Sequence, residues 1–193
     1  MTMLLLGLVL FLGVHSTRIV ADGWRTRTIA RIGEKPWKGL YALASVAAFV
    51  LVVWGWGLAR HNPVVLWTSP AGMRHLSALL MAVALVLLVA TYVPGNGIKA
   101  RLHHPMLLSV KVWAVAHLLA NGTLADLLLF GGFLAWAVLG FRSARQRDRA
   151  SGAVYAPGRT GPTLVAVALG MALWAALVMG GHAWLFGVSP LGA

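Results

Sequence analysis

The sequence predicts an all-α protein: a polytopic bundle of about six transmembrane helices with both termini in the periplasm. Of its 193 residues, 60% are hydrophobic and only 10% are charged, a composition outside that of ordinary soluble domains. Long apolar runs recur along the chain, and the polar segments between them hold most of the charges. Residues 1–193 are therefore expected to form a single transmembrane domain.

Each expected span is an apolar run, because a hydrocarbon core about 30 Å thick takes roughly 20 helical residues to cross. The first run has no basic segment before it and no small-residue cleavage site after it, so it is expected to remain as a helix. Only a short polar turn containing Asn121 and Gly122 separates the fourth run from the fifth. The expected spans are residues 2–20, 38–59, 73–93, 105–122, 124–142 and 163–187.

The basic residues gather on one side of this expected bundle. Because the excess of Lys and Arg marks the cytoplasmic side, both termini should face the periplasm of a bacterial inner membrane. The other side holds only Arg60 and Arg74. The cytoplasmic set is Arg18, Arg25, Arg27, Arg31, Lys35, Lys38, Lys99, Arg101, Arg142, Arg145, Arg147, Arg149 and Arg159.

Charge placed in loops between apolar runs is a topology signal, so membrane lipids are the expected partners and nucleic acid is not. The segment 143–162 is expected to be a basic cytoplasmic loop held near anionic headgroups. Cysteine is absent, so a metal would need His, Met, carboxylate or backbone ligands. Motifs of soluble enzymes, such as a phosphate-binding glycine loop, a nucleophile elbow or a zinc-binding HExxH helix, are missing.

Three of the seven histidines, His15, His117 and His182, fall within expected spans. An ionisable group at membrane depth is costly and therefore indicates function, although a neutral ring bonded to a neighbouring helix is the common alternative. Two histidines on different helices could hold a haem iron from both faces. His15 and His117 are the candidate pair.

Depth is the obstacle to this pairing. His15 is expected about 4.5 Å from the cytoplasmic surface, whereas His117 lies about 18 Å along its helix from Pro105. If Lys111 extends its ammonium to the inner interface, His117 is only about 9 Å deep, and the Asn121-Gly122 turn must then be covered by protein. Lys111 could instead reach a haem propionate or another anion.

Two further residues near this pair have alternative interpretations. The small side chain of Ala114, one turn before His117, would leave room for a flat macrocycle, but close helix packing has the same requirement. Asp126 could pair with a histidine or Lys111, but an N-terminal cap of the fifth span is the favoured interpretation.

Three stretches carry a resemblance to a known family: FLGVHS (residues 11–16), HHPMLLSVKVWAVAHLLANG (103–122) and GHAWLFGVSP (181–190). With these motifs the chain is identified as a member of the NnrU family, small bacterial integral membrane proteins associated with denitrification. The resemblance covers nearly the whole chain, and the pattern WxxAHLLxNG is its most specific part. The family is in turn similar to the 15-cis-zeta-carotene isomerase of plastids and cyanobacteria, a membrane enzyme that uses haem b.

The resemblance implies a haem b site with His15 and His117 as the axial metal ligands. In the isomerase, a further histidine and the cysteine of WCLAH exchange as ligands; these positions correspond to His61 and Ala114 here. Since alanine cannot bind iron, the same ligand exchange cannot operate in this chain.

Three hypotheses follow from the residues and the resemblance. The leading one is an inner-membrane haem b protein of nitrogen-oxide metabolism, which carries electrons to a redox partner or releases one histidine to bind nitric oxide. The second is a haem-dependent isomerase of a lipophilic, carotenoid-like substrate. The third is a metal-free accessory protein that assembles or supplies nitrite or nitric oxide reductases.

Overall fold

A computed structural model describes residues 1–191, and within them every regular element is a helix. The all-α prediction is therefore confirmed. The elements are α1 (Thr2–Val20), α2 (Asp22–Ile32), α3 (Glu34–His61), α4 (Met73–Tyr92), α5 (Gly97–Leu102), α6 (Pro105–Ala120), α7 (Leu124–Ser151), α8 (Thr160–Ala176), the π-helical turn η1 (Leu177–Gly181) and α9 (His182–Phe186).

Five helical segments are long and apolar enough to cross a membrane: α1, α3, α4, α7 and the continuous segment Thr160–Phe186. The expected fourth span is α6, which is apolar but has only 16 residues. At a rise of 1.5 Å per residue it is about 24 Å long, less than the thickness of the hydrocarbon core. The chain is thus a multi-pass membrane protein with five candidate spans and a shorter sixth apolar helix.

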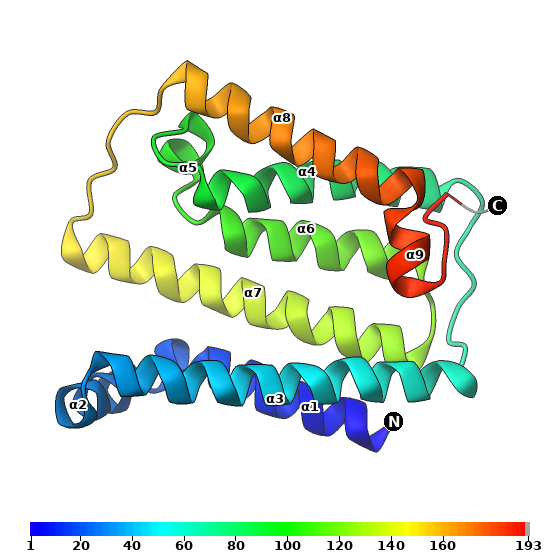
Figure 1. Ribbon diagram of the computed structural model, residues 1–193, viewed down its shortest axis with the longest axis horizontal. Coiled ribbons are helices and arrows are strands. Elements are labelled where there is room, and N and C mark those ends of the chain that lie inside the picture. Colours follow the sequence, from blue (N-terminus) through cyan, green and yellow to red (C-terminus); the bar gives the residue numbers. More distant parts are fainter. Residues whose placement is uncertain (192–193) are drawn as a thin grey trace.

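The long helices run back and forth, so that the two termini lie at the same end of the molecule (Figure 1). Neighbouring helices follow the order α3, α1, α7, α6, α4, α8. The short helices α2 and α5 lie at the end opposite the termini (Figure 1). In this order α7 lies between α1 and α6, the helices that contribute His15 and His117.

Helices α1 and α3 pack closely because each offers a glycine to the other. A Cβ atom at Gly55 of α3 would overlap the backbone of Met3 and Leu4, and one at Gly7 of α1 would overlap the backbone of Leu51 and Val52. Small residues at such crossings let helix backbones approach closely. Within a membrane the hydrophobic effect does not drive helices together, so this close packing favours their association. This contact fixes α1, and with it His15.

Helix α7 extends beyond the expected span end at residue 142. It continues to Ser151, and Gly152 ends it with a positive φ of 63°. The segment FRSARQRDRAS is rich in Arg, Gln and Ala, which are good helix formers, so polarity alone did not end the helix. The expected loop over 143–162 is therefore helical through residue 151, and residues 152–159 form the connection to α8.

The turn between α6 and α7 is covered by the chain itself. The backbone N–H groups of Leu66 and Trp67 donate to the Gly122 carbonyl at 2.8 and 3.1 Å, and that of Leu124 donates to Val64 at 2.8 Å. A Cβ at Gly122 would overlap the Trp67 carbonyl, so the covering segment requires glycine there. The protein cover that a short α6 needs is provided by residues 64–67.

The first turn of α7 has a capping box. The backbone N–H of Asp126 donates to the Thr123 hydroxyl, and the Asp126 carboxylate accepts from the backbone N–H of Thr123. The favoured interpretation of Asp126 as a helix cap is therefore confirmed.

Candidate functional site: two histidines that flank helix α7

His15 lies near the C-terminal end of α1 among aromatic rings. Its Nδ1 is 2.7 Å from the backbone carbonyl oxygen of Phe11, one turn earlier, and the two rings stack with centroids 4.1 Å apart. Tyr41 of α3 and Trp136 of α7 meet the imidazole edge-on at 5.3 and 6.1 Å. The indole Nε1 of Trp136 is buried and has no hydrogen-bond partner within residues 1–191. A buried hydrogen-bond donor without a partner therefore belongs to a side chain that packs against His15.

His117 on α6 has the same local arrangement. Its Nδ1 is 2.9 Å from the carbonyl oxygen of Trp113, one turn earlier, and its ring stacks on Phe130 of α7 at 4.5 Å. The indole of Trp113 contacts Phe130 and Phe133 of α7 at 5.0 and 5.5 Å. Both histidines therefore contact aromatic side chains of α7, one from α1 and the other from α6.

The carbonyl contacts assign the same tautomer to both rings. A carbonyl oxygen can only accept, so each Nδ1 carries a proton, and in the neutral ring Nε2 keeps its lone pair. In metal-bound histidines the other ring nitrogen commonly donates a hydrogen bond to a carbonyl or carboxylate, which fixes the orientation of the ring and raises the basicity of the ligand. The donor chemistry of His15 and His117 thus fits axial ligation of a haem iron, and the unpaired Trp136 N–H would suit an acceptor group of such a ligand.

Aromatic side chains fill the space between the two imidazoles. Phe11 contacts Phe133 at 5.6 Å, and Phe133 contacts Trp113, so rings connect His15 to His117 without a gap. Along α7 their contact residues, Trp136 and Phe130, are six positions apart, about 9 Å by helical rise. To share one iron, the histidines would have to close this offset and the intervening rings would have to turn aside.

Lys111 points toward the end of the bundle that carries most of the basic residues. Its Nζ lies 4.0 Å from the centroid of Phe141 on α7, and His104, seven residues earlier on the chain, contacts the same ring at 6.1 Å. The ammonium therefore lies at the level of the start of α6, away from His117. This geometry favours the snorkelling interpretation of Lys111, with a cation–π contact to Phe141.

The remaining expected site residues are not brought to the two histidines in the same way. Ala114 is fully buried, as close packing of α6 requires. His61 is exposed at the C-terminal end of α3. Within residues 1–191, no group of three or more His, Asp or Glu side chains has a geometry that could hold a metal ion.

Comparison with known proteins decides the family. The family described as NnrU protein matches residues 3–190. The chain belongs to the NnrU family. No curated protein and no solved structure matches the chain.

The structure of this NnrU-family chain contains a second cluster of polar residues, which was not predicted from the sequence. The carboxylate of Asp148 on α7 accepts hydrogen bonds from His104 Nε2 at 2.8 Å and from the Tyr155 hydroxyl at 3.1 Å. The ring of His103 stacks on Tyr155 at 3.9 Å, and Arg145 bonds its Nδ1. The cluster holds the α7–α8 connection against the start of α6.

Two sequence features pointed to this cluster. Asp148 is one of only four acidic residues and lies within a run of arginines, and His103-His104 precedes a proline. His103 is also the only residue other than glycine with positive φ in the part of the chain that the structure describes.

Burial, followed by the hydrogen bond to Asp148, raises the pKa of the Tyr155 phenol, so this group stays a neutral donor.

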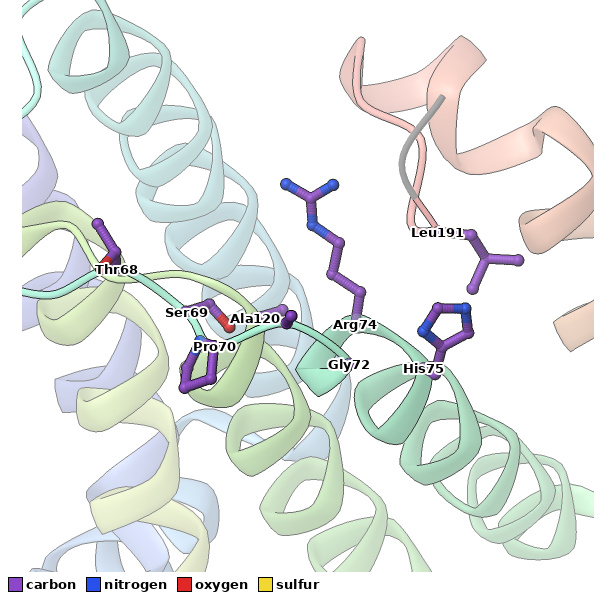
Figure 2. A pocket seen from close by; sticks show the side chains of 9 residues that line it. Thr68, Ser69, Pro70, Gly72, Arg74, His75, Ala120 and Leu191 are labelled. Atoms are coloured by element: carbon purple, nitrogen blue, oxygen red, sulfur yellow. The ribbon is translucent and has the colours of Figure 1, made fainter.

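Two cavities lie at opposite ends of the NnrU-family bundle. The cavity at the end with the termini measures about 500 Å³ and lies between residues 68–72 and the start of α4. Figure 2 shows Arg74 and His75 projecting from the first turn of α4, with Leu191 beside His75. The other cavity, about 490 Å³, lies at the opposite end between α1, α2 and α3, and His15 forms part of its wall.

Proposed function

We propose that this NnrU-family protein is a haem b protein of the bacterial inner membrane, with His15 and His117 as axial ligands. The observation that supports it best is the matched anchoring of the two imidazoles. Each donates Nδ1–H to the carbonyl one turn earlier and keeps the Nε2 lone pair. An anchored second ring nitrogen is common in metal-bound histidines, and ionisable residues within membrane spans are candidates for function.

The role proposed for the haem is redox or nitric oxide chemistry in nitrogen-oxide metabolism. Held by His15 and His117, the haem would supply one-electron redox chemistry or a binding site for a small ligand such as nitric oxide. The chain supplies aromatic neighbours through Phe11, Phe130 and Phe133. Ala114 has no ligand atom to offer, so the cysteine-dependent ligand exchange of the carotenoid isomerase is not part of this proposal.

An absorption spectrum of the detergent-purified protein, oxidised and then dithionite-reduced, tests the proposal together with a pyridine haemochrome assay. We expect low-spin haem b near one per chain. His15→Ala and His117→Ala should each lose the low-spin signature, because each removes one axial nitrogen. The matched control is His75→Ala, which changes an exposed histidine in the wall of the cavity at the end with the termini, far along the chain from His15 and His117. It should keep the wild-type spectrum.

The two single variants also test whether the ligands act as a pair. If only one of them changes the spectrum, the iron has a single histidine from this set and the pairing is wrong. Colourless protein from haem-replete cells would reject the haem proposal and leave the accessory role in nitrogen-oxide reduction.

A further inference from the structure

The cavity beside His15 has a wall of basic and aromatic side chains. Its basic residues are Arg18 of α1, Arg25 of α2 and Lys38 of α3, so three helices each bring one cation to the same space. One carboxylate, Glu34, also lines it and lies 2.7 Å from Lys38 Nζ. Three cations against one carboxylate leave the cavity with a net positive charge.

Of the three cations at the cavity, Arg18 and Arg25 are less neutralised by carboxylates of the protein than Lys38 is. Among the described residues, Arg25 has one carboxylate partner, Asp22, whose oxygen lies 3.8 Å from the guanidinium nitrogen. The Asp22 side chain is about half exposed. No carboxylate lies within ion-pair distance of Arg18 in residues 1–191. Two guanidinium groups at one cavity suit a phosphate, whose oxygens accept paired N–H donors.

The other wall residues indicate that the anion belongs to an amphiphile. Ile29, Trp37 and Tyr41 line the same cavity, and Trp and Tyr favour the boundary between headgroups and hydrocarbon. Helix α2 is a polar helix of 11 residues at this end of the bundle, joining the ends of two apolar helices. At such a level of a membrane protein the abundant phosphate is that of a lipid.

We propose that this cavity binds the phosphate of an anionic glycerophospholipid, held by Arg18, Arg25 and Lys38. The headgroup would enter between α1, α2 and α3, and the acyl chains would extend toward the hydrocarbon. The assignment stands on the cavity alone and does not depend on haem. It gives the basic end of the bundle one specific lipid contact in addition to its general attraction to anionic membranes.

Native mass spectrometry of the full chain in mild detergent tests the proposal, with phosphatidylglycerol, phosphatidylcholine and inorganic phosphate added in turn. The wild type should retain one phosphatidylglycerol at least tenfold more strongly than phosphatidylcholine. The variant Arg18→Gln/Arg25→Gln/Lys38→Gln should lose that preference, since each cation near an anionic headgroup contributes about fivefold.

A charge-matched control separates the cavity from the general positive charge. Arg27→Gln/Arg31→Gln/Lys35→Gln removes two Arg and one Lys from exposed neighbouring positions outside the cavity, and should keep the preference. Equal losses in both triple variants, or equal retention of the two lipids by the wild type, would overturn the proposal. Displacement of the lipid by millimolar phosphate would reassign the site to a free anion.

The lipid and haem proposals fail separately. His117→Ala should lose haem and keep the bound lipid, because His117 does not line this cavity. If the cavity triple variant lost haem and kept its lipid preference, the three cations would belong to a haem site and the lipid assignment would be wrong. Circular dichroism of each variant verifies that the helices remain folded.

Discussion

At the scale of single residues, several polar side chains of this membrane protein donate hydrogen bonds to backbone carbonyls of a neighbouring helix. Ser109 donates to the carbonyl of Ala84 at 2.7 Å, and Trp174 Nε1 donates to that of Ala78 at 2.8 Å. Such bonds join α4 to α6 and to α8 where water is scarce. By contrast, three buried groups of the described residues have no hydrogen-bond partner, Trp56 Nε1, Ser77 Oγ and Trp136 Nε1, and of these Trp136 packs beside His15.

Tyr155 provides a residue-scale prediction for the Asp148 cluster. In Tyr155→Phe the stack on His103 can persist, but the hydrogen bond to Asp148 is lost. We expect the amides of Gly152 and Ala153, which donate to carbonyls at the end of α7, to exchange hydrogen roughly two- to tenfold faster, the range that one net hydrogen bond represents. Hydrogen exchange with mass spectrometry measures it. Tyr92→Phe, an exposed tyrosine on α4, should leave these amides unchanged; equal effects would mean that the bond does not hold the connection.

The raised pKa of Tyr155 gives this contact a pH dependence. Burial and the Asp148 carboxylate favour the neutral phenol in the folded protein, so its contribution to stability is complete below the ordinary tyrosine pKa. It is lost as the pH rises through the higher pKa of the folded state. Hydrogen exchange of the Gly152 and Ala153 amides, corrected for its intrinsic pH dependence, should therefore accelerate at alkaline pH in the wild type and show no such step in Tyr155→Phe.

At the scale of elements, the glycine crossing of α1 and α3 determines how firmly His15 is placed. Gly55→Ala introduces a Cβ where the backbone of Leu4 lies, so α1 must shift or separate. Overpacking of this kind costs about 1–3 kcal/mol. Thermal unfolding in detergent, followed by circular dichroism, should show a lower midpoint.

Gly57→Ala is the matched control for this crossing. It lies two residues later on the same helix, and nothing is within 4 Å of its new Cβ. Because alanine is the better helix former, Gly57→Ala should be neutral or slightly stabilising. Equal destabilisation by both substitutions would show that helix propensity or lipid exposure, and not the crossing, sets the stability.

Elements defined by local pattern were predictable from the sequence, whereas those defined by long-range contact were not. The apolar runs located α1, α3, α4 and α7, and Asn121-Gly122 located the turn, because length and turn chemistry are local properties. Helix α2 was missed because it is polar and short, and the extension of α7 was missed because arginines suggested a loop.

The candidate site was predictable only as a set of residues. Sequence reasoning selected His15 and His117, and their one-turn anchors follow from helical geometry. That α7 lies between their helices, with Phe133 and Trp113 in the space between the rings, depends on packing that no local pattern encodes. The partnership of His104 with Asp148, 44 positions apart, has the same origin.

At the scale of the whole molecule, charge asymmetry predicts how the bundle sits in a membrane. The basic residues assigned to the cytoplasmic side belong to α2, to α5 and to the neighbouring ends of α1, α3, α7 and α8, all at one end of the bundle (Figure 1). Arg60 ends α3 and Arg74 begins α4 at the opposite end, where the termini lie. By the positive-inside rule, the first end should face the cytoplasm. The absence of cysteine makes this testable in the full-length chain, since any introduced thiol is the only one.

Single-cysteine labelling gives the topological prediction. Ala71→Cys, in the exposed segment before α4, should react with a membrane-impermeant maleimide in intact spheroplasts, because that end faces outward. Ala153→Cys, exposed in the connection after α7, should react only after the membrane is opened. The reverse pattern would invert the bundle, and labelling of both positions in intact spheroplasts would mean that an even number of the three apolar helices between them, α4, α6 and α7, crosses the membrane. The reverse pattern would also move the lipid cavity and the Asp148 cluster to the outer face, since they lie at the same end as residue 153.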